Sequence, residues 1–135
     1  MNDYPAEYDT VSFAPVLYLA NVAAAIAFYK KALGANELRR WSNDDGSLHV
    51  AEMAIRGTLF HIHEEVIREN ELSPLTLKGT TAVLGLFVDD PDTMMVQAMA
   101  AGGHATSPMQ NYDYGYRQGG ITDPFGHHWV FQKRI

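Results

Sequence analysis

The chain has 135 residues, no cysteine and a formal net charge of -6. This length suits one ordinary domain with a sizeable core. The absence of cysteine excludes disulfides, thiolate metal sites and cysteine nucleophiles. The acidic balance argues against a nucleic-acid partner, because phosphate contacts require a basic face. The acidic start shows no secretory signal and no apolar stretch is long enough to span a bilayer, so we expect no membrane partner and a cytoplasmic location.

The first half of the chain opens with a polar tail through about Asp9, which an apolar run over 11–19 follows. This run predicts a buried strand. Asn21 is a good helix N-cap and Gly34 a good helix stop, and apolar residues repeat between them at helical spacing. We therefore predict a helix between these two residues.

Three extended segments follow the helix, over 37–42, 48–55 and 58–64. Turn residues separate them, which predicts hairpins at 43–46 and 56–57. Residues 65–79 are polar and are interrupted by Pro74, so we expect a linker with one helical turn in it.

The second half repeats this order of elements. An apolar strand over 81–88 precedes a helix start at Asp90-Pro91, and the helix ends at Gly102-Gly103. We assign the methionines of this helix to its core; they are Met94, Met95 and Met99. Further strands are expected over 104–110, 116–122 and 127–133.

The two halves match when the chain is shifted by 69 positions, as from Leu17 to Leu86 (86 - 17). The same shift places Phe60 on Trp129 and Ile62 on Phe131 in the closing strands. A constant offset at both anchors indicates an internal repeat. We predict one domain over 1–135, made of a first module over 10–64, the linker and a second module over 80–135.

Two local motifs resemble a known family. They are Ala27-Phe28-Tyr29-Lys30-Lys31-Ala32-Leu33-Gly34 at the end of the first helix and Asp123-Pro124-Phe125-Gly126-His127-His128-Trp129 before the final strand. With the repeat, they resemble the vicinal oxygen chelate superfamily of glyoxalase I, bleomycin-resistance proteins and extradiol dioxygenases. The second motif, with 114–117 upstream of it, is similar to the PhnB-like branch.

The resemblance implies an α+β fold in which two tandem βαβββ modules form a curved mixed sheet around a cleft. It also implies that the cleft binds a small organic molecule and that a homodimer completes it. Side chains alternate along a strand, so large apolar residues identify the helix-facing side. Phe60, Ile62, Trp129 and Phe131 take that side, which leaves these residues for the cleft: Leu59, His61, His63, His128, Val130 and Gln132.

Metal-dependent members of the superfamily hold a divalent ion with four side chains. The resemblance places these positions at Ala14, His61, Val83 and Val130, and the 69-residue shift relates Ala14 to Val83 and His61 to Val130. Alanine and valine cannot ligate a metal, so we expect no metal and no other cofactor. A relocated divalent-metal site is the less favoured alternative, built from His61 and His63 with a further ligand from His49, Glu52 or His128.

Other candidates have two interpretations each. Glu52 is a candidate general base or a partnered strand residue. Arg117, near Tyr112, Tyr114 and Tyr116, either grips an anionic or aromatic ligand or is ion-paired on a surface loop. Tyr18 and Phe87 occupy equivalent repeat positions, and we expect their side chains to face the cleft rather than the core. We expect His127 to cap its turn. The expected ligand-binding residues are Tyr18, His61, His63, Phe87, Arg117, His128, Val130 and Gln132.

These patterns favour a metal-independent small-molecule-binding protein, which sequesters an organic compound or drug or catalyses a reaction not yet defined. One alternative is a metal-dependent, glyoxalase-like lyase or isomerase that uses the relocated histidine site. The other is a dimerisation module with a vestigial cleft. No nucleophilic triad, phosphate loop or dinucleotide fingerprint is present.

Overall fold

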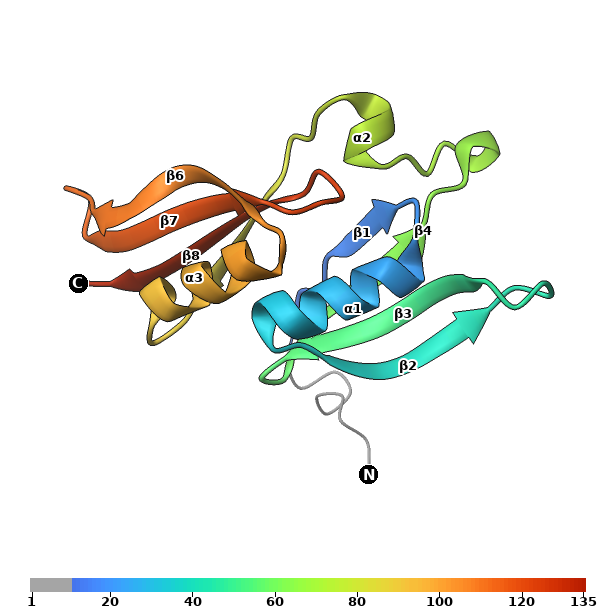
Figure 1. Ribbon diagram of the computed structural model, residues 1–135, viewed down its shortest axis with the longest axis horizontal. Coiled ribbons are helices and arrows are strands. Elements are labelled where there is room, and N and C mark those ends of the chain that lie inside the picture. Colours follow the sequence, from blue (N-terminus) through green and yellow to red (C-terminus); the bar gives the residue numbers. More distant parts are fainter. Residues whose placement is uncertain (1–10) are drawn as a thin grey trace.

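The computed structural model describes residues 11–135, so the predicted polar tail lies outside the described residues. Two four-stranded sheets form the frame, in the strand orders β1-β4-β3-β2 and β5-β8-β7-β6 (Figure 1). In each sheet the first and last strands of the module pair in parallel, and the other neighbours are antiparallel. The first module consists of β1 Val16–Leu19, α1 Val22–Leu33, β2 Asn36–Ser42, β3 Leu48–Ile55 and β4 Thr58–Glu64.

The second module has the same order of elements. It consists of β5 Val83–Phe87, α3 Pro91–Ala101, β6 His104–Asn111, β7 Tyr116–Thr122 and β8 His128–Arg134. Adding 69 to the bounds of α1 gives 91–102, which coincides with α3 to within one residue. Between the modules lie the 3-10 turn η1 Ile67–Glu69 and the short helix α2 Pro74–Leu77. The predicted α+β fold with two tandem βαβββ units is confirmed.

The helix ends are those that the sequence predicts. The Asn21 side chain accepts a hydrogen bond from the amide of Ala24 at 3.0 Å, and Gly34 takes a left-handed conformation with a φ of 66°. In α3 the Asp90 side chain accepts from the amide of Thr93 at 3.1 Å, and Pro91 opens the helix.

Two predictions are corrected. Strand β1 begins at Val16 rather than at residue 11. The carbonyl of Pro15 accepts from the amide of His61, so this residue faces β4, but proline has no amide hydrogen to continue the ladder. Met99 is 44% exposed and does not belong to the core, because the buried stripe of α3 is limited to Pro91, Met95 and Ala98.

The two modules share one hydrophobic core. The ring of Tyr29, from α1, lies 5.6 Å from the ring of Trp129 in β8, and Phe60 in β4 lies 5.8 Å from the same indole. Helices α1 and α3 also contact each other. The helix-covered faces of both sheets therefore meet this core, and their opposite faces, here called the open faces, point away from it. No helix among residues 11–135 is long and apolar enough to cross a membrane.

A buried carboxylate joins the modules. Asp123 is 4% exposed, and it accepts hydrogen bonds from the Tyr29 hydroxyl at 2.5 Å and from Trp129 Nε1 at 2.9 Å. Its other oxygen accepts from the amides of Phe125 and His127 at 2.9 and 3.0 Å. Burial raises the pKa of Tyr29 well above its usual value, and the charge of Asp123 and its hydrogen bond act in the same direction.

His127 belongs to the same corner between the modules. Its backbone amide bonds Asp123, and its ring Nε2 donates to the carbonyl oxygen of Tyr18 at 2.9 Å. The backbone of His127 thus closes the turn, since its carbonyl also accepts from the amide of Asp123 at 2.8 Å, and its side chain connects the second module to β1.

Candidate functional site

The closing strands present the faces that their sequence predicts. On the helix side, Phe60, Ile62, Trp129 and Phe131 are between 0% and 3% exposed. Their neighbours in sequence point to the open faces and retain partial exposure, except Gln132, which is 8% exposed. On β4 these are Leu59, His61 and His63, and on β8 they are His128, Val130 and Gln132.

The first open face carries a buried carboxyl–imidazole pair. Strand register sets Glu52 of β3 beside His61 of β4, and His61 Nε2 lies 3.2 Å from Glu52 Oε2. Glu52 is 6% exposed, and Nδ1 of His61 is buried with no hydrogen-bond partner in the described part of the chain. Of the two interpretations of Glu52, the structure shows the partnered one. The pair can also hold a proton next to a bound molecule.

Aromatic side chains lie next to this pair. Tyr18, on β1, forms a T-shaped pair with His63 with 5.2 Å between the ring centres, and its hydroxyl donates to Glu71 at 3.1 Å. Desolvation, followed by the bond to Glu71, raises the pKa of Tyr18. On β2 the guanidinium carbon of Arg39 lies 4.3 Å from the ring centre of Trp41, which is 39% exposed. This face thus offers stacking surfaces and a cation.

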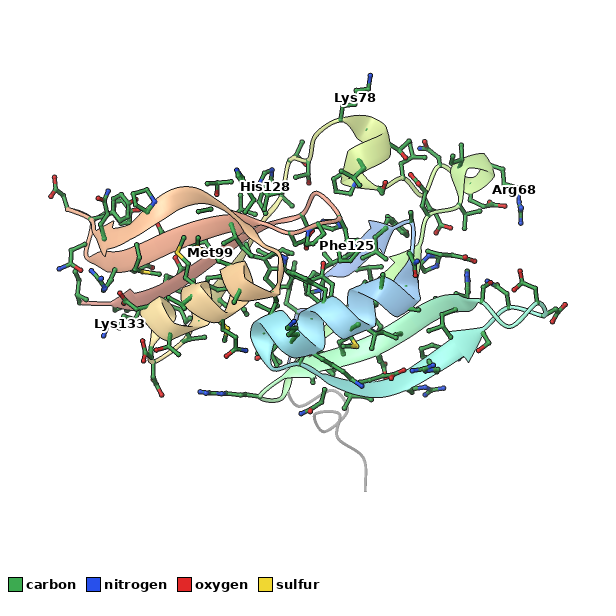
Figure 2. The ribbon with its side chains drawn as sticks, in the orientation of Figure 1. Arg68, Lys78, Met99, Phe125, His128 and Lys133 are labelled. Atoms are coloured by element: carbon green, nitrogen blue, oxygen red, sulfur yellow. The ribbon has the colours of Figure 1, made fainter. Side chains whose placement is uncertain are left out.

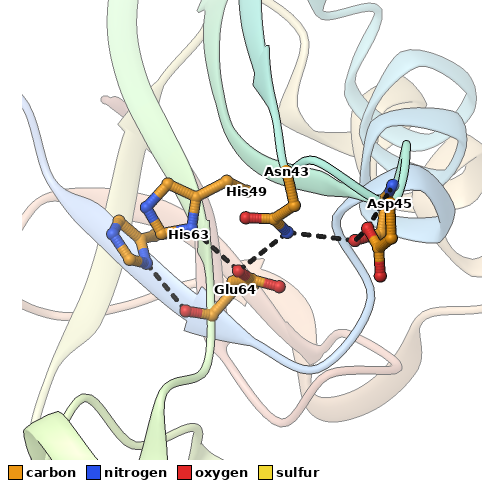
Figure 3. A network of polar contacts seen from close by, with 6 residues as sticks. Asn43, Asp45, His49, His63 and Glu64 are labelled. Atoms are coloured by element: carbon orange, nitrogen blue, oxygen red, sulfur yellow. Dashed lines mark hydrogen bonds and ion pairs between the residues drawn. The ribbon is translucent and has the colours of Figure 1, made fainter.

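A polar network lies at the end of this face (Figure 3). His49 Nδ1 lies 2.8 Å from the carboxylate of Glu64, and His63 Nδ1 lies 2.7 Å from the backbone carbonyl of Glu64. The amide of Asn43 also donates to the Glu64 carboxylate at 3.0 Å. The hydrogen bond from His49, followed by that from Asn43, lowers the pKa of Glu64, which is therefore ionised at neutral pH.

The second open face is uncharged at its centre. Phe87 of β5 is 48% exposed; its ring packs edge-on against Tyr116 at 5.4 Å, and Arg134 lies over it at 4.4 Å. The amide of Gln118 donates to Gln132 at 2.5 Å. His128, which is labelled in Figure 2, lies at the far end of this face. Its Nδ1 hydrogen-bonds the hydroxyl of Thr122 at 2.9 Å.

The tyrosine-rich segment divides between two sides of the second sheet. Tyr112 and Tyr114 stack at 5.2 Å, and Tyr114 meets Tyr116 edge-on at 5.7 Å, which extends the aromatic row of Phe87. Arg117 instead faces α3, where its Nε and Nη2 bond both oxygens of Asp92 at 2.8 and 2.7 Å. Of the two interpretations of Arg117, the structure shows the ion pair, and it places this residue away from the other candidates.

The residues that the sequence resemblance assigns to the metal positions do not fit a metal ion. Ala14, Val83 and Val130 have hydrocarbon side chains, and His61 directs its Nε2 at Glu52. His61 and His63 have different partners and do not converge on one point. Within residues 11–135 no group of three or more histidine, aspartate or glutamate side chains is arranged to hold a metal ion.

An apolar cavity of about 270 Å³ lies between the two modules, near the start of β1. Its lining includes Phe13, Leu59, Val83, Gly85 and Trp129. This volume is just below the usual range of small-molecule sites, which begins near 300 Å³.

Local sequence patterns do not identify three residues of the open faces, which are Arg39, Trp41 and Gln118. The two-residue turn at Arg56-Gly57 pairs Ile55 with Thr58, so counting back along both strands places Glu52 beside His61 and Val50 beside His63. The register of β2, by contrast, has two irregularities, so no count along the sequence places Trp41 on the open face.

Comparison with known proteins defines the family. The model of the Glyoxalase/Bleomycin resistance protein/Dioxygenase superfamily matches residues 12–131. The chain therefore belongs to this superfamily. An uncharacterized protein of Mycobacterium tuberculosis strain H37Rv, Rv0887c, is 34% identical over 127 residues, which cover 92% of this chain and 75% of the relative.

Solved structures share the fold of this chain. TioX from Micromonospora sp. ML1 has a TM-score of 0.71 at 21% identity, with 93% of this chain and 100% of TioX covered. A bleomycin-binding protein, solved in complex with bleomycin, has a TM-score of 0.68 at 17% identity, with 93% and 100% covered. At these identities the likeness concerns the fold.

Proposed function

We propose that this protein is a metal-independent member of the superfamily that binds a small organic molecule, as a homodimer, on its open faces. The observation that carries the proposal is the set of aromatic and imidazole side chains on these faces, which are at least partly exposed in the single chain. Trp41 and Phe87 are 39% and 48% exposed, and aromatic surface of this size is costly to leave in water. They include Tyr18, Trp41, His61, His63, Phe87 and Tyr116.

A second copy of the chain supplies the missing wall of the site. The helix-covered faces meet in the shared core, so the two open faces of one chain point away from this core and are left uncovered by its own helices. Val16 and Val83, at the edges of these faces, are 49% and 61% exposed. In a twofold dimer, the first open face of each chain can lie opposite the second open face of its partner. This arrangement buries the exposed side chains of both chains and forms two equivalent sites.

The chemistry of the two faces favours a planar, partly polar ligand. Trp41, Tyr18 and Phe87 offer ring faces for stacking. Gln118, Gln132 and the Glu52–His61 pair offer donors and acceptors that fix orientation. The bleomycin-binding protein with the same fold supports this class of ligand, and bleomycin is a suitable first probe. The similarity of the Asp123–Trp129 segment to the PhnB-like branch is consistent with the proposed binding of a small organic molecule.

Thermal unfolding with added bleomycin and with aromatic metabolites tests the binding. A ligand at a hundred times its dissociation constant stabilises the fold by about 2.7 kcal/mol, so the melting temperature rises. We expect Trp41→Ala to reduce this rise. Val96→Ala is the matched control, because Val96 is 69% exposed on α3, which lies on the helix-covered side. An unchanged rise in Trp41→Ala would contradict the placement of the site.

Sedimentation of the protein at several concentrations tests the dimer. We expect a dimer that Val83→Asp dissociates, because the charge would be buried at the interface. A monomer at all concentrations would refute the shared site. If the protein is a dimer but no probe binds, the module with a vestigial cleft is the correct interpretation.

The Glu52–His61 pair favours a second candidate function, that of a glyoxalase-like lyase or isomerase. A buried carboxyl group in contact with an imidazole is suited to move a proton to or from a bound substrate. Product formation from a glyoxalase substrate such as the hemithioacetal of methylglyoxal, followed by nuclear magnetic resonance, tests it. The enzymatic function would be established if the wild-type protein turns over the substrate, Glu52→Gln abolishes turnover and Val96→Ala retains it.

A further inference from the structure

We propose that His49 and His63 form a two-imidazole site for a divalent transition metal ion, copper(II) foremost, at the end of the first open face. This site is separate from the superfamily's metal positions and does not depend on the proposed binding of an organic ligand. The tautomers of the two rings, their spacing and the exposure of their second nitrogens define the site.

Glu64 determines where both rings carry their protons. Its carboxylate and its backbone carbonyl can only accept hydrogen bonds, so the Nδ1 atoms of His49 and His63, at 2.8 and 2.7 Å, must be the donors. In the neutral rings each Nε2 therefore has a free lone pair. Histidines that ligate metals have the same arrangement, with the second nitrogen donating to a carboxylate or backbone carbonyl.

The spacing of the rings matches a shared ion. A metal–nitrogen bond of about 2.0–2.1 Å places the ion about 3.2 Å from each ring centre. Two such rings at angles of about 90–109° have centres about 4.5–5.2 Å apart. The centres of His49 and His63 are 4.6 Å apart. Figure 3 shows the Nδ1 atoms of both rings turned toward Glu64 and the Nε2 atoms turned away from it.

Both Nε2 atoms are available. Neither has a hydrogen-bond partner among the residues that the structure describes, and neither is among the buried unsatisfied atoms, so both reach solvent. The His49 side chain is 39% exposed. Because a third histidine or carboxylate does not join them within residues 11–135, water or a ligand atom completes the coordination. Copper(II) binds most tightly to such nitrogen sites among the first-row ions.

Titration with copper(II) chloride at pH 7.5 tests the site by calorimetry and by tryptophan fluorescence. Register places Trp41 beside Val50 and Val50 beside His63, so a bound copper ion lies about two strand spacings, roughly 10 Å, from Trp41 and quenches its emission. We expect one ion per chain. Both His49→Ala and His63→Ala should weaken binding at least tenfold.

His61→Ala and His104→Ala are the controls, because they remove a neighbouring and a remote histidine, and each should change the affinity less than threefold. Circular dichroism shows whether each variant is folded. Long-range proton–nitrogen spectra without metal provide a second measurement, in which the neutral form of both rings should carry its proton on Nδ1. A neutral ring with its proton on Nε2, or equal copper affinity in wild type, His49→Ala and His63→Ala, would overturn the proposal.

Discussion

The buried carboxylate that joins the modules leads to a specific prediction for Asp123→Asn. The substitution keeps the shape of the side chain and replaces one acceptor oxygen with an NH2 group. Oδ1 faces the amides of Phe125 and His127, where the asparagine oxygen can remain. The NH2 group must then occupy the place of Oδ2, which accepts from the Tyr29 hydroxyl and Trp129 Nε1.

The cost follows from the hydrogen-bond inventory. A tyrosine hydroxyl can rotate and accept from the NH2 group, but an indole N–H can only donate, so Trp129 Nε1 is left buried and unpaired. That loss costs about 1–3 kcal/mol, and the exchange of a charged for a neutral acceptor in the remaining bonds adds about 1 kcal/mol. We therefore expect Asp123→Asn to lower the free energy of unfolding by about 2–4 kcal/mol.

Urea denaturation followed by circular dichroism measures this loss. With a slope of about 2 kcal/mol per molar, the midpoint falls by about 1–2 M. Asp113→Asn is the matched control, because Asp113 is exposed in the β6–β7 turn, and it should change stability by less than about 0.5 kcal/mol. Equal effects of the two substitutions would refute the role assigned to Asp123.

Three further predictions concern stability. Because the pKa of Tyr29 is raised in the folded state, the stability that its protonated hydroxyl contributes is fully present below pH 10 and is lost as the pH rises further. Tyr29→Phe should therefore reduce the decline of the urea midpoint between pH 10 and 11. A β-carbon at Gly119 would lie 2.6 Å from Met95 Sδ and 3.0 Å from a backbone carbon, so Gly119→Ala should cost about 1–3 kcal/mol in the same assay; unchanged stability would contradict the packing. Asp92→Asn should lower the urea midpoint only slightly, and less in 1 M salt, because the Arg117 and Asp92 side chains are 30% and 48% exposed; a large, salt-independent fall would show that the pair is more than a surface ion pair.

Much of the fold could be predicted because it depends on local rules. Asn21 and Gly34 end the first helix through their own side-chain and backbone properties. The alternation of Phe60 and Ile62 sets the faces of β4, because one face of that strand is buried and the other is not. Proline also acts locally, and Pro15 could have indicated the start of β1.

The candidate site was less predictable, because its contacts join distant segments. In β7, Gly119 and Gly120 provide no alternation of large and small residues, so the sequence leaves open whether Arg117 faces a ligand or α3. The pairing of Tyr29 with Asp123 spans 94 positions and depends on the packing of one module against the other. Local patterns contain no information about such a contact.

The sequence by itself determined the repeated module and its helix ends, because both follow from residue identity and spacing. The resemblance to the superfamily added the assignment of the metal positions, three of which have hydrocarbon side chains. Only the tertiary structure decided that the helix-covered faces share a core, that Arg117 is bound to Asp92 and that His49 and His63 lie side by side. These features result from strand register and from the packing of the modules, in which long-range contacts determine which side chains meet.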